Sequence, residues 1–521
     1  MKILLVAMPD SASCFDHIME LPNLALCSLA GNLDGRHEVR ILDLVKHRRR
    51  AAQEVERQMR EFSPDLVGIS AMSFQIGSAR KTAALCRALK PDVITVLGGY
   101  HATIMWKEIG EGPDSRYFDY VVRGEGEAIF NELVRTLDAS GDLDSIAGLS
   151  WRKGDEYRHN VPAPLLHLEH VRPPDRSPRV SRDFLWMGRS FDVAETSRGC
   201  TMPCGFCSIR RMYGKTFRLY PDDQVVADLR AVKERGARGA LFVDDNITLD
   251  GPRLKELCLR FEAERLDDLF LVMQASVFPI AADLGMAEVM ARGGVRMVFL
   301  GIENGDERNL KVLGKKGQAC RTEKVVRALR DAGIIVIGGF IVGNPDDREE
   351  DVRATYRYVR DVGVDHGIVQ CLTPYPKTEL RKQLLERGLV TNADDLDRYN
   401  GFIPNVRTEH LSERDLARIM TSAGTRLYWD PRYMIQNGIW KASPRQTFWM
   451  LWNNVKYVYT GYAGRMFLSR HRFEPSIPID VPEGMRAPSR TEILTPGKDP
   501  VPGRYPGERD AVPAAATMTQ G

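Results

Sequence analysis

The stretch TSRGCTMPCGFC, residues 196–207, holds three of the nine cysteines of the chain in the spacing CxxxCxxC. Cys200, Cys204 and Cys207 lie among glycine and proline residues, which favour an open loop. Three thiolates on one loop suit a soft metal or an iron–sulfur cluster. A zinc site would need a fourth nearby cysteine or histidine, which this stretch does not contain. We therefore predict a 4Fe–4S cluster with one open iron, rather than three incidental or structural cysteines.

The same stretch resembles the cysteine motif of the radical S-adenosylmethionine (SAM) superfamily, with Phe206 as the aromatic residue before the last cysteine. The resemblance implies that the three cysteines hold the cluster and that its open iron binds the amino and carboxylate groups of SAM. One-electron cleavage of SAM would then give methionine and a 5′-deoxyadenosyl radical. The resemblance also places Phe206 near the adenine and implies an external electron donor of the flavodoxin or ferredoxin type.

Length and composition indicate a multidomain globular protein. The 521 residues favour two to four domains, and 43% apolar with 27% charged residues suits a chain that buries large cores. The formal charge of +3 gives no argument for nucleic acid as a partner. The sequence shows no secretory leader, no uncharged run that could span a membrane and no disulfide-like framework. We expect a cytoplasmic protein that does not bind nucleic acid.

The first part of the chain alternates apolar segments with helical patterns. Strands are expected at 2–7, 38–43, 65–70 and 93–97, with helices at about 24–33, 50–62 and 77–89. This alternation predicts an α/β fold with a doubly wound, Rossmann-like parallel sheet. Ligands of such sheets lie beyond the carboxyl ends of the strands. There the sequence places the polar residues 70–73 and the glycine-rich segment GGYHAT, residues 98–103.

The GGYHAT segment and the run DYVVRGEGE, residues 119–127, resemble the cobalamin-binding domain that precedes the cluster domain in many radical SAM enzymes. The resemblance covers about residues 1–145 and implies bound cobalamin. The residues that it places around cobalamin or its nucleotide tail are Ser70, Ser73, Gly98, Gly99, His101, Thr103, Gly124 and Glu125. Judged alone, a loop histidine such as His101 is more often a surface or capping residue.

One departure from the cobalamin domains concerns the ligand below cobalt. Domains that supply a histidine to cobalt carry DxHxxG in the first loop. Residues 10–18 here read DSASCFDHI, which lacks that spacing and the glycine. We therefore predict that no protein histidine lies below the metal.

A second α/β region follows a predicted surface linker at 146–190, which contains a short strand pair and a proline-rich passage. Further strands are expected at 192–196, 239–244, 269–275, 296–302, 334–342 and 367–372, with helices at 221–235, 252–263, 283–292, 321–332 and 347–361. Six strand–helix units match the partial (β/α)6 barrel of radical SAM enzymes, at residues 191–400. The site of a barrel lies at the carboxyl ends of its strands.

Four residues of the barrel region are predicted by resemblance to contact SAM: Phe206, Asp245, Glu303 and Gly339. Glu303 lies in the segment GIENG, and Leu313, Gly314 and Lys315 complete a pattern similar to GIESG…LK of the family. From the residues alone, Asp244 and Asp245 could bind a metal or cap a loop, and Glu303 could be a solvated side chain. No catalytic residue is assigned.

Two positions depart from the radical SAM pattern. Ser276 stands where relatives often carry an arginine, so the partner of the SAM carboxylate is left open. Lys377 replaces a glycine in the segment TPYPKT, residues 373–378, which is expected to change the loop that closes over the substrate.

The last part of the chain changes character. Residues 401–473 are predicted to be helical and are rich in tryptophan and tyrosine. Such aromatic residues usually form the core of helices that cover a barrel mouth. They could instead form a peripheral membrane contact or a wall for a large apolar substrate. Residues 474–521 are rich in proline and are predicted to be a disordered tail.

Taken together, these features predict a cobalamin-dependent radical SAM methyltransferase that acts on an unactivated carbon of a large apolar substrate, tetrapyrrole- or lipid-like. The fused arrangement resembles the branch of the anaerobic magnesium-protoporphyrin ester cyclase and the bacteriochlorophyll and hopanoid methylases. An oxidative cyclase, or another enzyme that functionalises C–H bonds without methyl transfer, is the first alternative. The second alternative is a non-catalytic cobalamin or iron–sulfur sensor.

Overall fold

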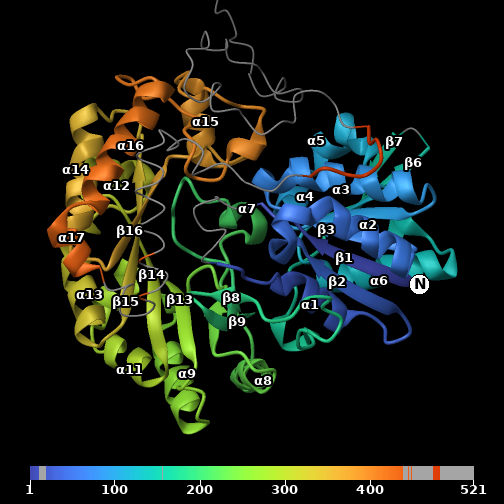
Figure 1. Cartoon of the computed structure of the whole chain (residues 1–521), viewed down its shortest axis with the longest axis horizontal. Coiled ribbons are helices and arrows are strands. Elements are labelled where there is room, and N and C mark those ends of the chain that lie inside the picture. The colour runs from blue at the N-terminus through green and yellow to red at the C-terminus, as the bar shows by residue number, and fades with distance from the viewer. Residues whose placement is uncertain (11–18, 155, 438–443, 445–447, 449–472, 481–521) are drawn as a thin grey trace, which may run out of the picture.

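The structure is a computed structural model that describes residues 1–10, 19–154, 156–437, 444, 448 and 473–480. Within these residues two seven-stranded sheets lie side by side, the first from the N-terminal part of the chain and the second from its middle (Figure 1). Helices flank both sheets. The chain therefore has the predicted α/β fold, with a parallel-sheet domain followed by a curled barrel sheet.

The first sheet has the strand order β2-β1-β3-β4-β5-β6-β7. Its strands are β1 (Lys2–Ala7), β2 (Glu38–Asp43), β3 (Leu66–Ser70), β4 (Ile94–Gly98), β5 (Tyr120–Val122), β6 (Leu149–Lys153) and β7 (Glu156–His159). The first five strands pair in parallel, and β6 and β7 add an antiparallel edge. The carboxyl ends of β1 to β5 therefore meet at one edge of the sheet.

Helices cover both faces of the first sheet because alternate side chains of each strand point in opposite directions. Leu4 and Val6 pack in one cluster with α2 (Ala51–Phe62) and α3 (Ile76–Leu89). Ile3 and Leu5 pack in the other, with α1 (Leu24–Asn32) and α6 (Gly126–Ala139). Two short helices, α4 (Tyr100–Ile104) and α5 (Trp106–Glu111), follow β4.

The second sheet has the order β16-β15-β14-β13-β12-β9-β8 and is parallel except for β8. Its strands are β8 (Leu185–Trp186), β9 (Arg189–Ala194), β12 (Gly239–Phe242), β13 (Phe270–Ser276), β14 (Val295–Glu303), β15 (Ile335–Val342) and β16 (His366–Cys371). The six parallel strands confirm the predicted six-unit open barrel.

Helices between the strands of the second sheet cover its outer face (Figure 1). They are α8 (Asp222–Glu234), α9 (Gly251–Ala263), α10 (Val277–Ala282), α11 (Met286–Arg292), α12 (Glu307–Leu313), α13 (Ala319–Asp331) and α14 (Glu349–Asp361). Three more helices, α15 (Glu379–Glu386), α16 (Glu413–Tyr428) and α17 (Pro431–Gln436), follow the last strand. Between β9 and α8 lie the small elements β10 (Ser197–Arg198), α7 (Ile209–Tyr213) and β11 (Arg218–Leu219).

The segment predicted as a surface linker, residues 146–190, is instead largely built into the two sheets. β6 and β7 extend the first sheet, and the ring of His159 packs on Trp106 with centroids 4.6 Å apart. Further on, Ile41 of β2 exchanges backbone hydrogen bonds of 2.9 Å with Pro178 and Val180. The physical reason is that the backbone N–H and C=O groups of these segments form hydrogen bonds with strands at the edges of the sheet.

Two arginines of this segment are buried because aspartates of the second sheet region neutralise them. Arg176 lies 2.6 Å from Asp228 of α8, and Arg179 lies 2.7 Å from Asp192 of β9. The segment therefore joins the two sheets through buried ion pairs as well as through the chain itself.

The described C-terminal residues bind both parts of the molecule. α16 packs on α14, and Trp429 follows it with 42% of its surface exposed. The other aromatic residues of the predicted helical region lie mostly outside the described residues. Residues 474–480, which were predicted to belong to the disordered tail, pack on the first sheet's helices through Ile477 and Ile479, and Ser476 donates two hydrogen bonds to Glu56 of α2. The predictions for 481–521 also lie outside the described residues.

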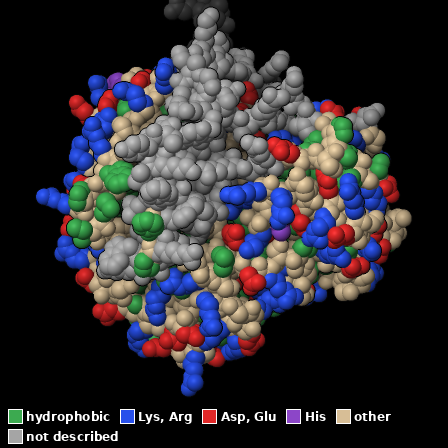
Figure 2. Space-filling model, in the orientation of Figure 1, with side chains coloured by type: hydrophobic (Ala, Val, Ile, Leu, Met, Phe, Trp, Pro, Cys, Tyr) green, Lys and Arg blue, Asp and Glu red, His purple; other side chains and the backbone are tan. Residues whose placement is uncertain are grey.

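The surface carries both signs of charge intermingled, as the face in Figure 2 shows. Among the helices that the structure describes, none is both long and apolar enough to cross a bilayer.

Candidate functional site

The loop that carries Cys200, Cys204 and Cys207 follows β9 and is packed closely on both sides. Gly199 has a φ of +88°, and a Cβ there would lie 2.4 Å from the carbonyl oxygen of Thr216. On the other side, a Cβ on Gly314 would lie 2.4 Å from the carbonyl oxygen of Pro203. Both glycines are therefore needed for the loop to pack where it does.

The three thiols are free and half-buried. Burial raises the pKa of Cys204 to about 11 and that of Cys207 to about 12, so both are protonated until a metal binds. Within the described residues no three His, Cys, Asp or Glu side chains converge on a single ion. A cluster does not need such convergence, because each cysteine binds a different iron.

The two adjacent aspartates at the end of β12 have different surroundings. Asp244 is buried and accepts hydrogen bonds from the Thr196 backbone, the Thr196 hydroxyl and the Ser197 hydroxyl, which fixes β9 to β12. Asp245 accepts a hydrogen bond of 2.9 Å from the backbone of Gly199, directly before Cys200. Burial raises the pKa of Asp245 to about 6. Asp244 is thus structural, whereas Asp245 lies at the cysteine loop.

Glu303 at the end of β14 is held by a lysine. Its φ is +64°, the β14–β15 register shifts between Gly301 and Glu303, and its carboxylate lies 2.6 Å from Nζ of Lys315. Both side chains are at least 89% buried, with exposed fractions of 11% for Glu303 and 6% for Lys315. Burial alone would lower the pKa of Lys315, but the Glu303 carboxylate raises it, so the ammonium stays charged.

The other predicted SAM contacts lie around this pair. Gly339 of β15 pairs in register with Gly301 of β14, and a Cβ on Gly339 would meet the ring of Phe299 at 2.9 Å. Phe206 is half-buried against the core of the second sheet. The structure therefore gathers the cysteine loop, Asp245 and Glu303 at the carboxyl ends of the strands, with Gly339 one strand further on. The roles of these residues stay predictions.

At the first sheet, five of the eight predicted cobalamin residues form a continuous edge. The Thr103 hydroxyl donates to the carbonyl of Gly99 at 3.0 Å and accepts from the backbone of Gly124 at 2.9 Å. Gly99 has a φ of +89°, and a Cβ there would lie 3.0 Å from the Ser70 hydroxyl. A Cβ on Gly98 would meet nothing closer than 4.0 Å, and one on Gly124 nothing within 4 Å. The backbone at Gly98 and Gly124 is therefore open to a ligand.

Two other predicted cobalamin residues point into the domain. His101 is 2% exposed, and its Nδ1 lies 3.3 Å from the hydroxyl of Ser73, which is also buried. Burial lowers the pKa of His101 to about 3, so the imidazole is neutral. In the described surroundings these two side chains support the GGYHAT segment from inside.

The GGYHAT segment also faces the cysteine loop. α4, which contains Tyr100, packs against α7, which begins two residues after Cys207. Burial raises the pKa of Tyr100, and the nearby Asp245, Cys207 and Tyr213 add to the effect. The edge of the first sheet and the cysteine loop of the second are thus direct neighbours.

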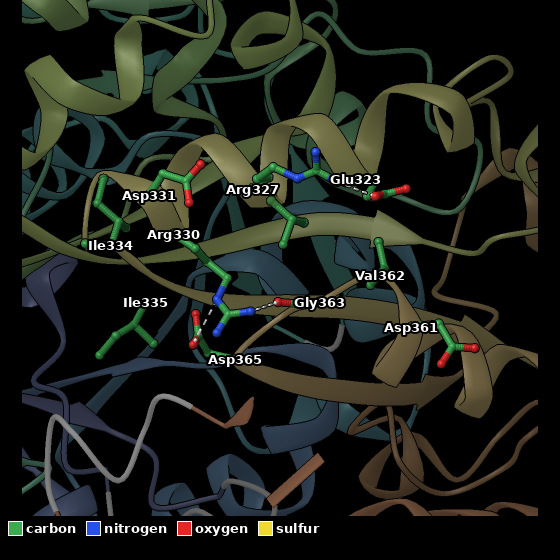
Figure 3. Close-up of a pocket in the computed structure, with 12 residues that line it drawn as sticks. Glu323, Arg327, Arg330, Asp331, Ile334, Ile335, Asp361, Val362, Gly363 and Asp365 are labelled. Carbon is green, nitrogen blue, oxygen red and sulfur yellow. Dashed lines mark hydrogen bonds and ion pairs between the residues drawn. The ribbon is translucent and has the colours of Figure 1, made fainter. Parts of the chain in front are cut away.

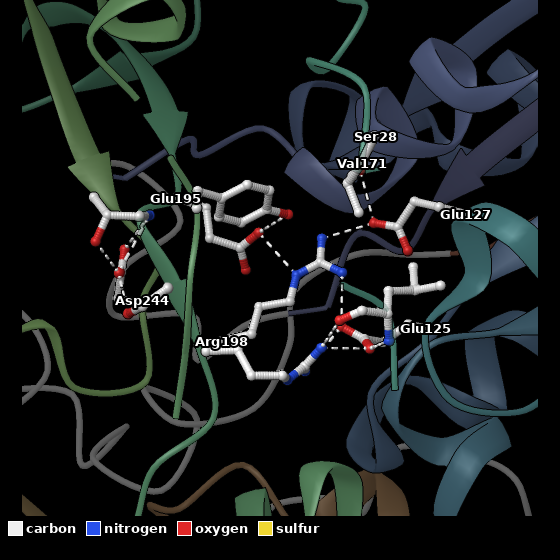
Figure 4. Close-up of polar contacts among 12 residues, drawn as sticks. Ser28, Glu125, Glu127, Val171, Glu195, Arg198 and Asp244 are labelled. Atoms are coloured by element: carbon white, nitrogen blue, oxygen red, sulfur yellow. Dashed lines mark hydrogen bonds and ion pairs between the residues drawn. The ribbon is translucent and has the colours of Figure 1, made fainter. Parts of the chain in front are cut away.

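An ion-pair junction joins the two sheets beside these loops (Figure 4). Arg198 binds Glu125 at 2.9 Å, Glu127 at 2.7 Å and Glu195 at 3.0 Å, and Arg218 binds Glu125 at 2.8 Å. Glu125 was predicted to contact cobalamin, but its carboxylate oxygens accept from these two guanidiniums. The sequence contains both partners, Glu125 and Glu127 in GEGE and Arg198 in SRGC. Nothing near either segment in the sequence indicates that they pair.

A second link lies on the far side of the cysteine loop. Lys377, which replaces the expected glycine, has a φ of +60° and forms an ion pair with Glu108 of α5. The neighbouring Tyr375 packs on the first sheet's core cluster, and burial raises its pKa to about 12 with Cys207 nearby. The lysine that departs from the family pattern therefore joins the loop after β16 of the second sheet to α5, a helix beside the first sheet.

A pocket of about 380 Å³ lies at the opposite ends of the strands (Figure 3). Its lining includes Gly333 to Ile335, which lead into β15, and Val362 to Asp365, which lead into β16. Arg330 lies in it between Asp365 and the carbonyl of Gly363. Because barrel chemistry occurs at the carboxyl ends, this pocket is separate from the site.

The residues present suit the cofactors that are predicted from the sequence. Free thiols on one constrained loop suit an iron–sulfur cluster, and the glycine edge at Gly98 and Gly124 leaves room for a flat ring. The family B12 binding domain matches residues 19–134, and the Radical SAM superfamily matches residues 194–359.

Similar proteins span both regions. An uncharacterized methyltransferase of Pyrococcus horikoshii is 30% identical over 447 residues, which cover 84% of this chain and 94% of that protein. The anaerobic magnesium-protoporphyrin IX monomethyl ester cyclase of Cereibacter sphaeroides is 26% identical over 394 residues, which cover 74% of this chain and 63% of the cyclase. The solved structure of the radical SAM methyltransferase TsrM from Kitasatospora setae, with cobalamin and a [4Fe-4S] cluster bound, has a TM-score of 0.65 at 20% identity.

The TsrM alignment covers 82% of this chain and 89% of TsrM, so the two share the fold over nearly their whole lengths. The two family matches, supported by the Pyrococcus relative, assign cobalamin, an iron–sulfur cluster and SAM as the cofactors. The chain belongs to the radical SAM enzymes that carry an N-terminal B12-binding domain.

Proposed function

We propose that this enzyme transfers a methyl group to an unactivated carbon of a large apolar substrate, of the tetrapyrrole or lipid class. One observation carries the proposal: α4 of the GGYHAT edge packs against α7, which begins two residues after Cys207, so the B12-binding domain lies against the cysteine loop. A methyltransferase of this kind needs its methyl donor and its radical source to face the same substrate carbon.

The residues divide into two sets. Cys200, Cys204 and Cys207 would hold the cluster, and Asp245, Glu303, Phe206 and Gly339 would hold SAM. Ser70, Gly98, Gly99, Thr103 and Gly124 would line cobalamin. When bound, the cluster and SAM supply a radical that removes a hydrogen atom, and cobalamin supplies the methyl group.

The chain itself contributes orientation and a water-poor site. Arg198 with its three glutamates fixes the cysteine loop to the B12-binding domain, and buried Tyr220 closes this side by donating a 3.0 Å hydrogen bond to Glu195. On the other side, the Lys377–Glu108 ion pair joins the loop after β16 to α5. Excluding water in this way protects a reactive carbon radical from side reactions.

An apolar substrate is supported by the aromatic side chains around Cys207. Tyr100, Tyr213 and Tyr375 come from three different segments; the phenol groups of Tyr100 and Tyr375 lie within electrostatic range of Cys207, and that of Tyr213 within range of Tyr100. The similar cyclase is named for a magnesium-protoporphyrin ester, a large and mainly apolar molecule. A peripheral membrane contact near Trp429 would suit such a substrate, and an external flavodoxin- or ferredoxin-type protein would supply electrons.

The test is anaerobic purification of the full chain with cobalamin supplied, followed by reduction with dithionite in the presence of SAM and the co-purifying small molecules. We expect 5′-deoxyadenosine, S-adenosylhomocysteine and a product heavier by one methyl group. Formation of 5′-deoxyadenosine and a modified product without S-adenosylhomocysteine would show the cyclase-type alternative. If no 5′-deoxyadenosine forms although cluster and SAM are bound, the protein is a sensor.

A further inference from the structure

The residue that replaces the expected arginine cannot balance the charge of a carboxylate. Ser276 at the end of β13 is 5% exposed, and its hydroxyl accepts a hydrogen bond of 2.9 Å from the side chain of Asn246. Its backbone N–H faces the hydroxyl of Thr248 at 3.3 Å. Ser276 is therefore a neutral member of a small polar network, and a cation for SAM must come from another element.

Three largely buried arginines near this network are already committed to other partners. Arg198 and Arg218 bind the glutamates of the junction. Arg253 binds Asp222 at 2.8 Å and the carbonyl of Tyr220 at 2.8 Å. Releasing any of these guanidiniums would leave a partly or fully buried carboxylate or carbonyl without its partner.

Lys315 is placed differently. Its Nζ lies 2.6 Å from Glu303 and 3.1 Å from the carbonyl of Gly301, and a Cβ on Gly301 would lie 2.9 Å from it. The close packing of Gly314 on Pro203 holds this lysine against the cysteine loop. All three cysteine thiols lie within its electrostatic reach.

The Glu303–Lys315 pair also has the right chemistry for an α-amino acid. The methionine part of SAM carries an ammonium and a carboxylate on one carbon, and the pair offers a carboxylate and an ammonium side by side. A lysine ammonium has three N–H donors. Glu303 and Gly301 accept two of them among the described residues, which leaves one for a ligand.

We infer that Lys315 binds the carboxylate of SAM, in the place of the missing arginine, while Glu303 faces the ammonium. This inference rests on the proposed function, because it requires SAM at the cysteine loop. The Glu303–Lys315 pair would thus bind both charged groups of the methionine part of SAM. The competing view is that the pair only ties the turn after α12 to β14, as buried ion pairs can do.

The test compares SAM with decarboxylated SAM, which keeps the ammonium and the sulfonium but lacks the carboxylate. Binding of each is measured by equilibrium dialysis to the anaerobically reconstituted full chain, with the cluster kept oxidised so that SAM is not cleaved. The quantity of interest is the ratio of the two affinities. In Lys315→Met we expect this ratio to fall by about tenfold, a usual effect for one charge-assisted hydrogen bond. Lys315→Arg should retain most of the ratio.

The matched control is Lys316→Met, because Lys316 is the next residue, carries the same charge and is exposed. It should leave the ratio unchanged. Iron and sulfide content and the cluster absorption must match the wild type in each variant, and Lys315→Arg covers the case in which the methionine variant does not fold. An unchanged ratio in Lys315→Met with a full cluster would overturn the inference. A wild-type protein that holds its cluster but binds neither compound would instead refute the proposed function.

Discussion

The guanidinium of Arg198 in β10 donates a hydrogen bond of 2.7 Å to the carboxylate of Glu127 in α6, although the two residues are 71 positions apart. Both side chains are almost fully buried, and Ser28 donates a second hydrogen bond to the same glutamate. The contact lies directly beside the two loops that are predicted to hold cofactors.

Replacing Arg198 by Met should lower the free energy of unfolding by about 3 kcal/mol, because it leaves buried carboxylates without a counter-charge. The measurement is the urea midpoint of the full chain. Arg308→Met removes an exposed arginine that also binds two aspartates, and it should shift the midpoint far less. Equal shifts in the two variants would contradict a structural role for the junction.

The same junction predicts a pH dependence. Burial raises the pKa of Glu195 to about 7, above its usual value, so the folded protein binds this proton more tightly than the unfolded chain does. The resulting stability is complete below about pH 4.5 and is lost as the pH rises toward 7. The expected size is on the order of 2 kcal/mol, because the carboxylate is partly exposed and paired with Arg198.

Glu195→Gln should remove that slope between pH 5 and pH 8, as measured by urea unfolding at several pH values. Glu264→Gln is a suitable control, since Glu264 also binds an arginine but is largely exposed. A slope that is the same in the wild type and in Glu195→Gln would show that the carboxylate is ionised throughout this range.

Cys204→Ala should abolish the brown absorption of the 4Fe–4S cluster, because the remaining two thiolates cannot hold three irons. Iron and sulfide analysis after anaerobic reconstitution gives the measurement. Cys320→Ala is the matched control, since Cys320 is exposed and lies on α13. Persistence of the full cluster in Cys204→Ala would remove this cysteine from the ligand set.

Gly98→Val should weaken cobalamin binding strongly while leaving stability nearly unchanged, because the added side chain enters open space beyond β4. Bound cobalamin is measured by its visible absorption after gel filtration. Gly35→Val adds the same side chain at an exposed glycine that also has open space around it. If both variants retain cobalamin equally, the cofactor does not lie over Gly98.

Lys377 can be tested by comparing two substitutions that both remove the ion pair with Glu108. Because its φ is +60°, Lys377→Gly should be more stable than Lys377→Ala by about 1 kcal/mol, since only glycine adopts this conformation without strain. Thermal midpoints of the two variants give the difference. A more stable alanine variant would show that the loop relaxes once the ion pair is removed.

The strands of the barrel could be predicted well because their signals are local. β15 was expected at 334–342 and is found at Ile335–Val342, an apolar run that is buried on both sides. The cysteine loop was equally local, since the spacing alone indicates its chemistry. In the first sheet, β1 and β2 begin and end at the residues that the sequence predicts.

Features that depend on distant partners could not be predicted. Trp151 and His159 look like part of a polar linker until α5 supplies a surface for them. Glu125 seemed available for a ligand because nothing near it in the sequence shows that Arg198 and Arg218 bind it. Lys315 was part of a quoted pattern, but only the fold places its ammonium between Glu303 and the cysteine loop.

Glu125 follows Gly124 directly, and Arg198 precedes Cys200 by two residues, so the ion pair between them acts as a common reference point for both loops. The gap between the B12-binding edge and the cysteine loop is thereby fixed within a few covalent bonds of each. The Lys377–Glu108 ion pair adds a second tie close by, because the backbone N–H of Leu380, three residues further on, donates a hydrogen bond of 3.0 Å to the carbonyl of Gly205 in the cysteine loop. Loosening either tie is therefore expected to change the distance between the two loops.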